Sequence, residues 1–209
     1  MRPELLVKAL AAIEPVTTLE KFQAASGIAS RSVAKDVLDF LAANGIGNAS
    51  KGAIEFSGSD RLHAAMLALQ IGCDIEQVSE YLSWRDFERL ASEVLRSLGY
   101  RTQTNVQLTK PRMQIDVVGV SSGFAIAVDC KHWKRSSMSS IATFSWKQAA
   151  RAERLIRHDG RISMAVPAIL TLHSESVGFA GRVPVVPVQR FRSFVMDVKG
   201  FLPEIYVAG

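Results

Sequence analysis

Apolar residues near the N-terminus recur three or four positions apart, the spacing of helices with one buried face. Proline, glycine and capping serine or threonine residues divide this stretch into three helices. We expect these helices at residues 3–13, 18–25 and 31–43. Two short extended segments around a polar Asn-Ala-Ser-Lys-Gly turn follow within residues 46–58. The N-terminal segment is therefore predicted to form three helices and a small hairpin.

This order of elements resembles a winged helix-turn-helix domain, which we expect over residues 1–57. In DNA-binding members of that class the third helix enters the major groove, and here it would present Arg31 and Lys35. However, Asp36 and Asp39 lie on the same helix, and the segment holds six basic and six acidic residues. A winged helix that contacts protein or packs on a neighbouring domain therefore stays an alternative.

A more acidic stretch follows at residues 58–83, and its pattern predicts two helices separated near Gly72. It holds one basic and four acidic residues, which argues against contact with DNA. We expect this stretch to be a helical connector between two domains.

The segment 84–209 alternates between helical and strand patterns. Its first helix, at residues 84–100, is strongly amphipathic. A Ser-Ser-Gly turn signal at residues 121–123 predicts a hairpin between the second and third strands. The order of elements predicts a second domain of mixed α/β class, with a sheet flanked by helices. The remaining elements are expected as strands at 101–108, 113–120, 124–133, 161–172 and 183–188, and as helices at 140–157 and 189–199.

Positive charge is concentrated in this second domain. The whole chain has a formal charge of +5, whereas residues 84–209 alone hold 18 basic and 10 acidic residues. Such an excess attracts a phosphate backbone, although a solvated surface helix with surplus arginine has the same pattern. The DNA contacts expected from this cluster are Lys134, Arg135, Lys147, Arg151 and Arg154.

Composition excludes several other classes of protein. Hydrophobic residues make up 48% of the chain, which is enough for a packed core. No uncharged apolar stretch reaches the roughly 20 residues that span a bilayer, so we expect no membrane contact. Cys73 and Cys130 are the only cysteines, so neither a disulfide framework nor a cysteine-based zinc site is expected, and the cytoplasm is the default location.

Charged residues inside two apolar strands mark the candidate site. Asp129 and Lys131 are two positions apart in one strand, and Asp116 interrupts the apolar run QIDVVGV in another. A charge in a buried strand is unfavourable unless it is paired or binds a metal. A two-residue turn at residues 122–123 would set Asp116 opposite Asp129 on one face of the sheet, whereas a three-residue loop would separate them. Two facing carboxylates beside an ammonium suit Mg²⁺, and a structural ion pair of Asp116 with Lys131 is the alternative.

Two helices add candidates to this site. Glu88 lies at the edge of the apolar stripe of its helix, from which it could reach inward or remain solvated. Gln148 occupies a position in line with apolar residues, and an inward glutamine usually hydrogen-bonds a specific partner or caps a backbone group. The same helix carries Lys147, Arg151 and Arg154 at a spacing that predicts a basic stripe for phosphates.

Four pieces of sequence within residues 84–200 carry a resemblance to a known family. They are FERLASEVLRSLGY, QIDVVGV, AVDCKHW and KQAARAERL, in this order. The set resembles the Mrr-like branch of the PD-(D/E)xK restriction-endonuclease-like superfamily. The resemblance implies a metal site built from an acid of the first helix, an Asp of the second strand, an acid-x-Lys pair of the third strand and a Gln of the next helix. These residues are Glu88, Asp116, Asp129, Lys131 and Gln148.

The chain departs from the family pattern at two positions. Ile115 stands before the strand aspartate where Pro is common, and Asp129 stands where Glu or Gln is more frequent, which shortens one ligand. The backbone carbonyl of Cys130, between the acid and the lysine, is a further candidate ligand. His132 and Trp133 follow directly and are expected at the rim of the site.

The sequence thus predicts a DNA endonuclease of the restriction or repair type that depends on Mg²⁺ or Mn²⁺. Its expected domains are a winged helix (1–57), a connector (58–83) and a nuclease-like domain (84–209), with a homodimer left open. The alternatives are a non-catalytic DNA-binding or regulatory protein that retains the nuclease fold, and a structural subunit that assembles through its winged helix.

Overall fold

The computed structural model describes residues 1–50, 52–109, 112–131, 138–171 and 178–209. By its internal contacts the chain divides into two compact units, Met1–Asp86 and Phe87–Gly209. The stretch 58–83, expected as a connector, lies within the first unit.

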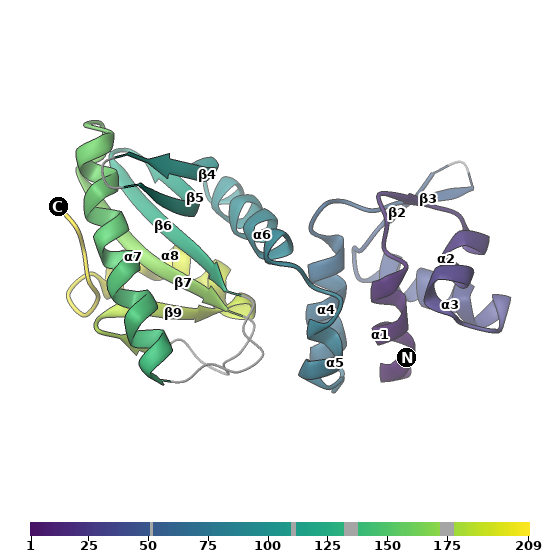
Figure 1. Ribbon diagram of the computed structural model, residues 1–209. Helices are drawn as coiled ribbons and strands as arrows, with labels where there is room; N and C mark the ends of the chain where they lie inside the picture. Colours follow the sequence, from purple (N-terminus) through teal and green to yellow (C-terminus); the bar gives the residue numbers. More distant parts are fainter. Residues whose placement is uncertain (51, 110–111, 132–137, 172–177) are drawn as a thin grey trace. The chain divides into compact units, whose positions relative to one another are not determined.

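The first unit consists of short helices and a small antiparallel sheet (Figure 1). The sheet has the strand order β1-β3-β2. Thr18 and Ser30 cap the second and third helices, since their side chains accept hydrogen bonds from the amides of Lys21 and Val33. The winged-helix interpretation of residues 1–57 stays a prediction. The elements are α1 (Pro3–Ala11), β1 (Val16–Thr17), α2 (Leu19–Ser26), α3 (Arg31–Ala43), β2 (Asn48–Ser50), β3 (Ala53–Glu55), α4 (Asp60–Gln70) and α5 (Ile75–Ser79).

A buried carboxylate fastens the hairpin of this unit to the start of α4. Asp60 Oδ2 accepts hydrogen bonds from the amides of Gly47, at 3.0 Å, and Ser57, at 2.8 Å. The Ser57 hydroxyl donates to the other oxygen, Oδ1, at 2.6 Å. Asp60 is therefore a structural acid whose bonds satisfy the backbone on both sides of the hairpin.

The second unit is built on a mixed six-stranded sheet with the order β4-β5-β6-β7-β9-β8. The first three strands run antiparallel as a meander, β6, β7 and β9 run parallel, and β8 is antiparallel to β9. The strands are β4 (Arg101–Leu108), β5 (Met113–Ser121), β6 (Phe124–Lys131), β7 (Met164–Thr171), β8 (Gly178–Ala180) and β9 (Val183–Pro187).

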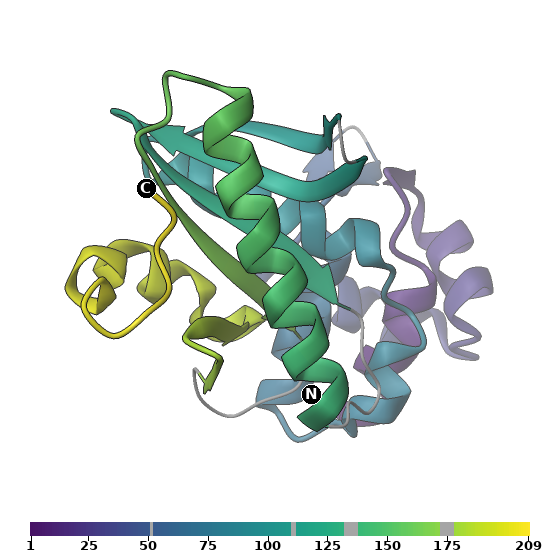
Figure 2. The same ribbon diagram turned by 60° about the vertical axis from the view of Figure 1, so that its left-hand side comes forward.

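Helices flank this sheet. The long helix α7 (Met138–His158) lies across one face of the sheet (Figure 2), where Ala152 and Leu155 join a core with Val118 and Ala127. The helix α6 (Trp84–Ser97) packs on β5, since a side chain at Gly119 would lie 3.0 Å from Leu95. A short 3-10 turn, Val188–Arg190, leads into α8 (Phe191–Phe201) near the C-terminus.

The predicted α/β class and the order of its main elements are confirmed. Two strands were missed, β1 with two residues and β8 with three. Both are too short for a period-two pattern to stand out from the surrounding loops. No helix in the described part of the chain is long and apolar enough to cross a membrane.

Candidate active site

The turn between β5 and β6 sets the register of the candidate site. Ser122 and Gly123 have φ angles of 50° and 78°, and this pair of left-handed residues forms a two-residue hairpin turn. Ser121 accordingly pairs with Phe124, and the ladder continues to the pair Val117–Val128. This is the register predicted for a two-residue turn, and its next step sets Asp116 opposite Asp129.

Beyond the pair Val117–Val128, a side-chain hydrogen bond takes the place of the backbone hydrogen bonds between β5 and β6. The amide of Cys130 donates to Asp116 Oδ2 at 2.8 Å, and regular pairing of β5 with β6 ends at Val117–Val128. Burial raises the pKa of Asp116 above its ordinary value, the Cys130 amide opposes this shift, and the nearby Asp129 carboxylate adds to it. Two carboxylates are therefore close enough to repel each other where the strands stop pairing.

Asp129 is almost fully buried, with 1% of its surface exposed, and it lies between two cations. Arg151 Nη1 donates to Asp129 Oδ1 at 2.9 Å, and Lys131 Nζ lies 2.9 Å from Oδ2. The lysine contact is an ion pair without hydrogen-bond geometry, because Oδ2 accepts no hydrogen bond within the described chain. One buried oxygen of Asp129 thus keeps its hydrogen-bonding capacity unused.

Gln148 links the helix to the strand that carries these charges. Its side chain is fully buried, and Nε2 donates to the carbonyl of Ala127 at 2.8 Å. Its Oε1 accepts a hydrogen bond from Arg151 at 3.0 Å. A chain of hydrogen bonds therefore runs from β6 through Gln148 and Arg151 to Asp129.

Glu88 and Cys130 lie near the same place. Glu88 is buried on α6, and its charge is among those that raise the pKa of the Cys130 thiol, after burial, Asp116 and Asp129. A thiol with a pKa well above its ordinary value stays protonated and is a poor nucleophile. Among the described residues, no group of three or more His, Cys, Asp and Glu side chains could hold a metal ion.

The basic residues expected to contact DNA have different surroundings. Arg151 is engaged with Asp129 and Gln148, and Arg154 donates from Nη2 to the carbonyl of Thr109 at 2.7 Å. Lys147 lies 6.0 Å from the centre of the Phe144 ring, whose face the Lys131 ammonium also approaches, at 5.0 Å. Four other expected residues lie outside the described residues. They are Lys134 and Arg135, expected to contact DNA, and His132 and Trp133, expected at the rim of the site.

In the first unit, both candidate DNA contacts are paired with acids. Arg31 lies 2.5 Å from Glu20, and Lys35 lies 2.6 Å from Asp39. These pairs are exposed, so water and salt screen them, yet they lower the positive potential of the α3 surface.

Sequence reasoning placed Arg151 on an outward basic stripe and missed its contact with Asp129. The spacing from Gln148 is compatible with this contact, because residues three apart on a helix are neighbours, but spacing alone does not give the direction of the arginine side chain. Phe144, which holds the face of its ring toward Lys131, was also missed as a member of the site.

The donors present fit a hard divalent cation. Mg²⁺ prefers oxygen ligands and is usually held by one or two carboxylates together with water and substrate phosphate. Asp116 and Asp129 supply two carboxylates, and Asp129 Oδ2, which faces Lys131 but accepts no hydrogen bond within the described chain, is a buried oxygen of the required kind. Burial and, to a smaller extent, the charge of Asp129 raise the pKa of Asp116, and a bound cation would offset both effects.

Replacing Asp116 by asparagine should stabilise the protein in the absence of divalent metal. The raised pKa means that the folded state disfavours the ionised carboxylate, and an amide removes that charge while its oxygen can still accept from Cys130. We expect a higher Tm for Asp116→Asn than for wild type in EDTA at pH 7, measured by calorimetry. Excess Mg²⁺ should reduce the difference in Tm between the variant and wild type. A lower Tm of the variant in EDTA would contradict the view that the ionised Asp116 carboxylate destabilises the metal-free fold.

Three solved structures resemble the chain at low sequence identity. A protein of unknown function, AF1548, is 20% identical with a TM-score of 0.32, over 52% of this chain and 54% of that one. Protein VC1899 from Vibrio cholerae is 12% identical with a TM-score of 0.40, over 97% of this chain and 51% of that one. Can2 from Sulfobacillus thermosulfidooxidans was solved in complex with cyclic tetra-adenylate. It is 13% identical with a TM-score of 0.32, over 82% of this chain and 42% of that one. The chain thus spans about half the length of these proteins.

No curated protein matches the sequence of this chain. A family model described as restriction endonuclease matches residues 79–153. The matched segment begins before α6 and ends within α7, so it contains Asp116, Asp129, Lys131 and Gln148 together with the strands that carry them. The part of the chain that holds the candidate site is therefore the part that is similar to the restriction endonuclease family.

Proposed function

We propose that this protein is a divalent-metal-dependent DNA endonuclease that hydrolyses phosphodiester bonds. The observation that carries the proposal is the meeting of Asp116, Asp129 and Lys131 at the end of the β5–β6 ladder, inside the segment that matches the family. Members of this superfamily generally use divalent metals, and we assign Mg²⁺ or Mn²⁺ to this site. DNA is the proposed substrate because the surplus positive charge lies in residues 84–209.

Asp116, Asp129 and the carbonyl of Cys130 would hold the metal, with Glu88 as a further candidate. In a strand, the N–H and C=O of one residue point to the same side. Because the Cys130 N–H points to Asp116, its carbonyl also faces the β5 side, where the two carboxylates meet. A bound Mg²⁺ would polarise a phosphate oxygen and lower the pKa of a coordinated water.

Lys131 is the proposed partner of the attacking water and of the phosphate charge. Its ammonium is held at the site by Asp129 on one side and the Phe144 ring on the other. A positioned cation can stabilise negative charge that develops on the phosphate in the transition state. Gln148 and Arg151 act as positioning residues, because they fix the Asp129 carboxylate from the helix side.

A cleavage assay separates this proposal from its alternative. Purified protein is incubated with linear, supercoiled, single-stranded and branched DNA in the presence of Mg²⁺, Mn²⁺ or EDTA. The proposal expects cleavage of at least one substrate with metal and none in EDTA. Binding of DNA with no metal-dependent cleavage of any substrate would instead favour a non-catalytic DNA-binding protein with the nuclease fold.

DNA affinity should depend on the cations of the second unit more than on those of α3. We expect the double variant Lys147→Ala/Arg154→Ala to lower the magnitude of the log K against log salt slope by about 0.9 for each phosphate that the variant no longer neutralises. The matched variant Arg31→Ala/Lys35→Ala should change it much less, since both cations are already paired with acids.

Fluorescence anisotropy of labelled duplex DNA in EDTA, over a series of salt concentrations, measures both slopes. The decrease in affinity should be similar for different DNA sequences, because phosphate contacts carry no base information. If the slope changes more in Arg31→Ala/Lys35→Ala than in Lys147→Ala/Arg154→Ala, the first unit is the main DNA-binding surface.

A further inference from the structure

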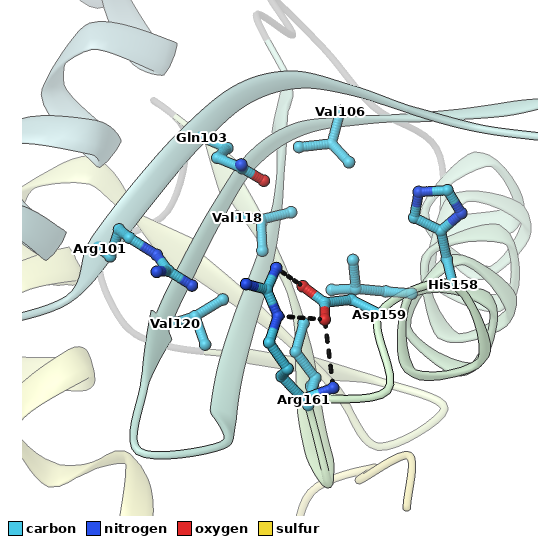
Figure 3. Close-up of a pocket in the computed structure, with 10 residues that line it drawn as sticks. Arg101, Gln103, Val106, Val118, Val120, His158, Asp159 and Arg161 are labelled. Atoms are coloured by element: carbon cyan, nitrogen blue, oxygen red, sulfur yellow. Dashed lines mark hydrogen bonds and ion pairs between the residues drawn. The ribbon is translucent and has the colours of Figure 1, made fainter.

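A pocket of about 270 Å³ lies in the second unit (Figure 3). It is formed by β4, β5, the last turn of α7 and the segment that follows α7. None of the proposed metal-binding or catalytic residues lines it. Its lining residues are Arg101, Gln103, Val106, Val118, Val120, Leu155, His158, Asp159, Arg161 and Ile162.

The floor of the pocket is apolar and its rim is polar. Valine side chains of β4 and β5, with Leu155 and Ile162, provide a surface of branched aliphatic groups. Around it, Arg101, Gln103 and His158 make no side-chain hydrogen bond or ion pair with any other residue in the described part of the chain. Ligand sites typically combine such an apolar lining with a few polar groups that are free to bind.

One polar group of the rim is paired with an acid, although its side chain is 74% exposed. Arg161 donates from Nε and Nη2 to the two oxygens of Asp159, each at 2.8 Å, and its amide also donates to Asp159 Oδ1 at 3.2 Å. These bonds lower the pKa of Asp159 to about 2, so the pair stays charged at neutral pH. The pair orients the guanidinium plane toward the space that Val118 and Val120 also line (Figure 3).

The geometry points to a nucleoside monophosphate as the ligand of this pocket; we propose that it binds a single nucleotide unit. The guanidinium plane that Asp159 orients and the floor of aliphatic side chains are both weakly hydrated surfaces, which suit the faces of a nucleobase. The amide of Gln103 offers both a donor and an acceptor to the edge of the base.

The phosphate is assigned to the remaining cation of the rim. Arg161 is paired with Asp159 through two side-chain hydrogen bonds, whereas Arg101 lies near enough to that carboxylate to lower its pKa but makes no hydrogen bond to it. Arg101 can therefore still bind a phosphate through two parallel hydrogen bonds. A volume of about 270 Å³ fits one nucleotide and is too small for a longer segment of nucleic acid.

Such a unit could be a free nucleotide or one nucleotide of a DNA strand. The chemistry of recognition is the same for both sources, so the experiment must separate them. The site is distinct from the proposed catalytic residues, and its ligand can be tested in the absence of metal and of cleavage.

The test is a titration of the full chain, in EDTA, followed by the methyl NMR signals of Val118 and Val120. We use dAMP, dCMP, deoxyadenosine and inorganic phosphate as probes. Both monophosphates should shift these signals, while deoxyadenosine and phosphate should bind at least ten-fold more weakly. Arg101→Ala should weaken the binding of the monophosphates about ten-fold or more, and Gln103→Ala should weaken it to a smaller extent.

Arg190→Ala, an exposed arginine that does not line the pocket, is the matched control and should leave binding unchanged. If a short single-stranded oligonucleotide displaces dAMP, the pocket binds one nucleotide of a DNA strand. If the oligonucleotide does not displace dAMP, the ligand is a free nucleotide. The proposal is overturned if neither monophosphate shifts the two valines, if phosphate alone binds as well as dAMP, or if Arg101→Ala binds like the control.

Discussion

Replacing Lys131 by methionine is expected to lower DNA cleavage by about 10²–10³-fold, with little change in DNA affinity. Methionine keeps a flexible side chain of similar length that can still pack on Phe144, but it removes the ammonium that lies 2.9 Å from Asp129 Oδ2. The rate of the chemical step should fall because the variant lacks the cation that stabilises the charge developing on the phosphate. Single-turnover cleavage and anisotropy binding, both on the same DNA, measure the two effects separately.

Two companion variants make this result specific. Asp129→Asn should lose cleavage to a similar degree, because it weakens both the proposed metal site and the contact with Arg151. Lys199→Ala, on helix α8, removes an exposed cation that is not among the proposed site residues and should keep full activity. If Lys131→Met cleaves at the rate of wild type, Lys131 has no part in the mechanism.

The hairpin that builds the site was accessible from the sequence because its determinants are local. A Ser-Gly pair can adopt two left-handed conformations in succession, and a two-residue turn then sets every pair of the ladder from Ser121 to Val128. The amphipathic pattern of α6 and the apolar strands were recognised for the same reason. The contact of Cys130 with Asp116 is different, since it arises only where the ladder ends and a side chain takes over.

The contacts of α7 were not accessible in this way. Periodicity places Gln148 inward, but it leaves open whether the flanking arginine faces solvent or the sheet, because this depends on how the helix axis crosses the strands. The pocket near His158 was missed for a similar reason. Its two sides, β4 and the end of α7, are about 50 residues apart in the chain and meet only when the sheet and helix are packed.

Replacing Arg151 by alanine is expected to impair both stability and cleavage. The variant lacks the hydrogen bonds of Arg151 to the buried Asp129 carboxylate, at 2.9 Å, and to Gln148, at 3.0 Å. A hydrogen bond to a charged group contributes roughly 1.5–3 kcal/mol, so we expect the free energy of unfolding to fall by about that amount. Urea denaturation of the metal-free protein measures this decrease.

The control is Arg157→Ala, on the same helix. Arg157 is exposed and lies 3.7 Å from Glu153, and a surface pair of this kind contributes about 0–1 kcal/mol. The two variants remove the same charge from α7, so a difference between them reports the contact with Asp129 rather than net charge. If both lose the same stability, the chain of hydrogen bonds from β6 to Asp129 does not stabilise the fold.

The effect of Arg151→Ala on catalysis separates positioning from general structural damage. Without the arginine, Lys131 is the one side chain among the described residues that still contacts the Asp129 carboxylate, which can then turn away from the place where a metal would bind. The variant should therefore need a higher Mg²⁺ concentration for half-maximal cleavage, and saturating Mg²⁺ should restore part of the rate. Arg151→Lys, which keeps the charge but not the forked geometry, should lie between wild type and Arg151→Ala. A variant that loses activity with an unchanged Mg²⁺ dependence would assign Arg151 to the phosphate instead, as the basic stripe in the sequence first indicated.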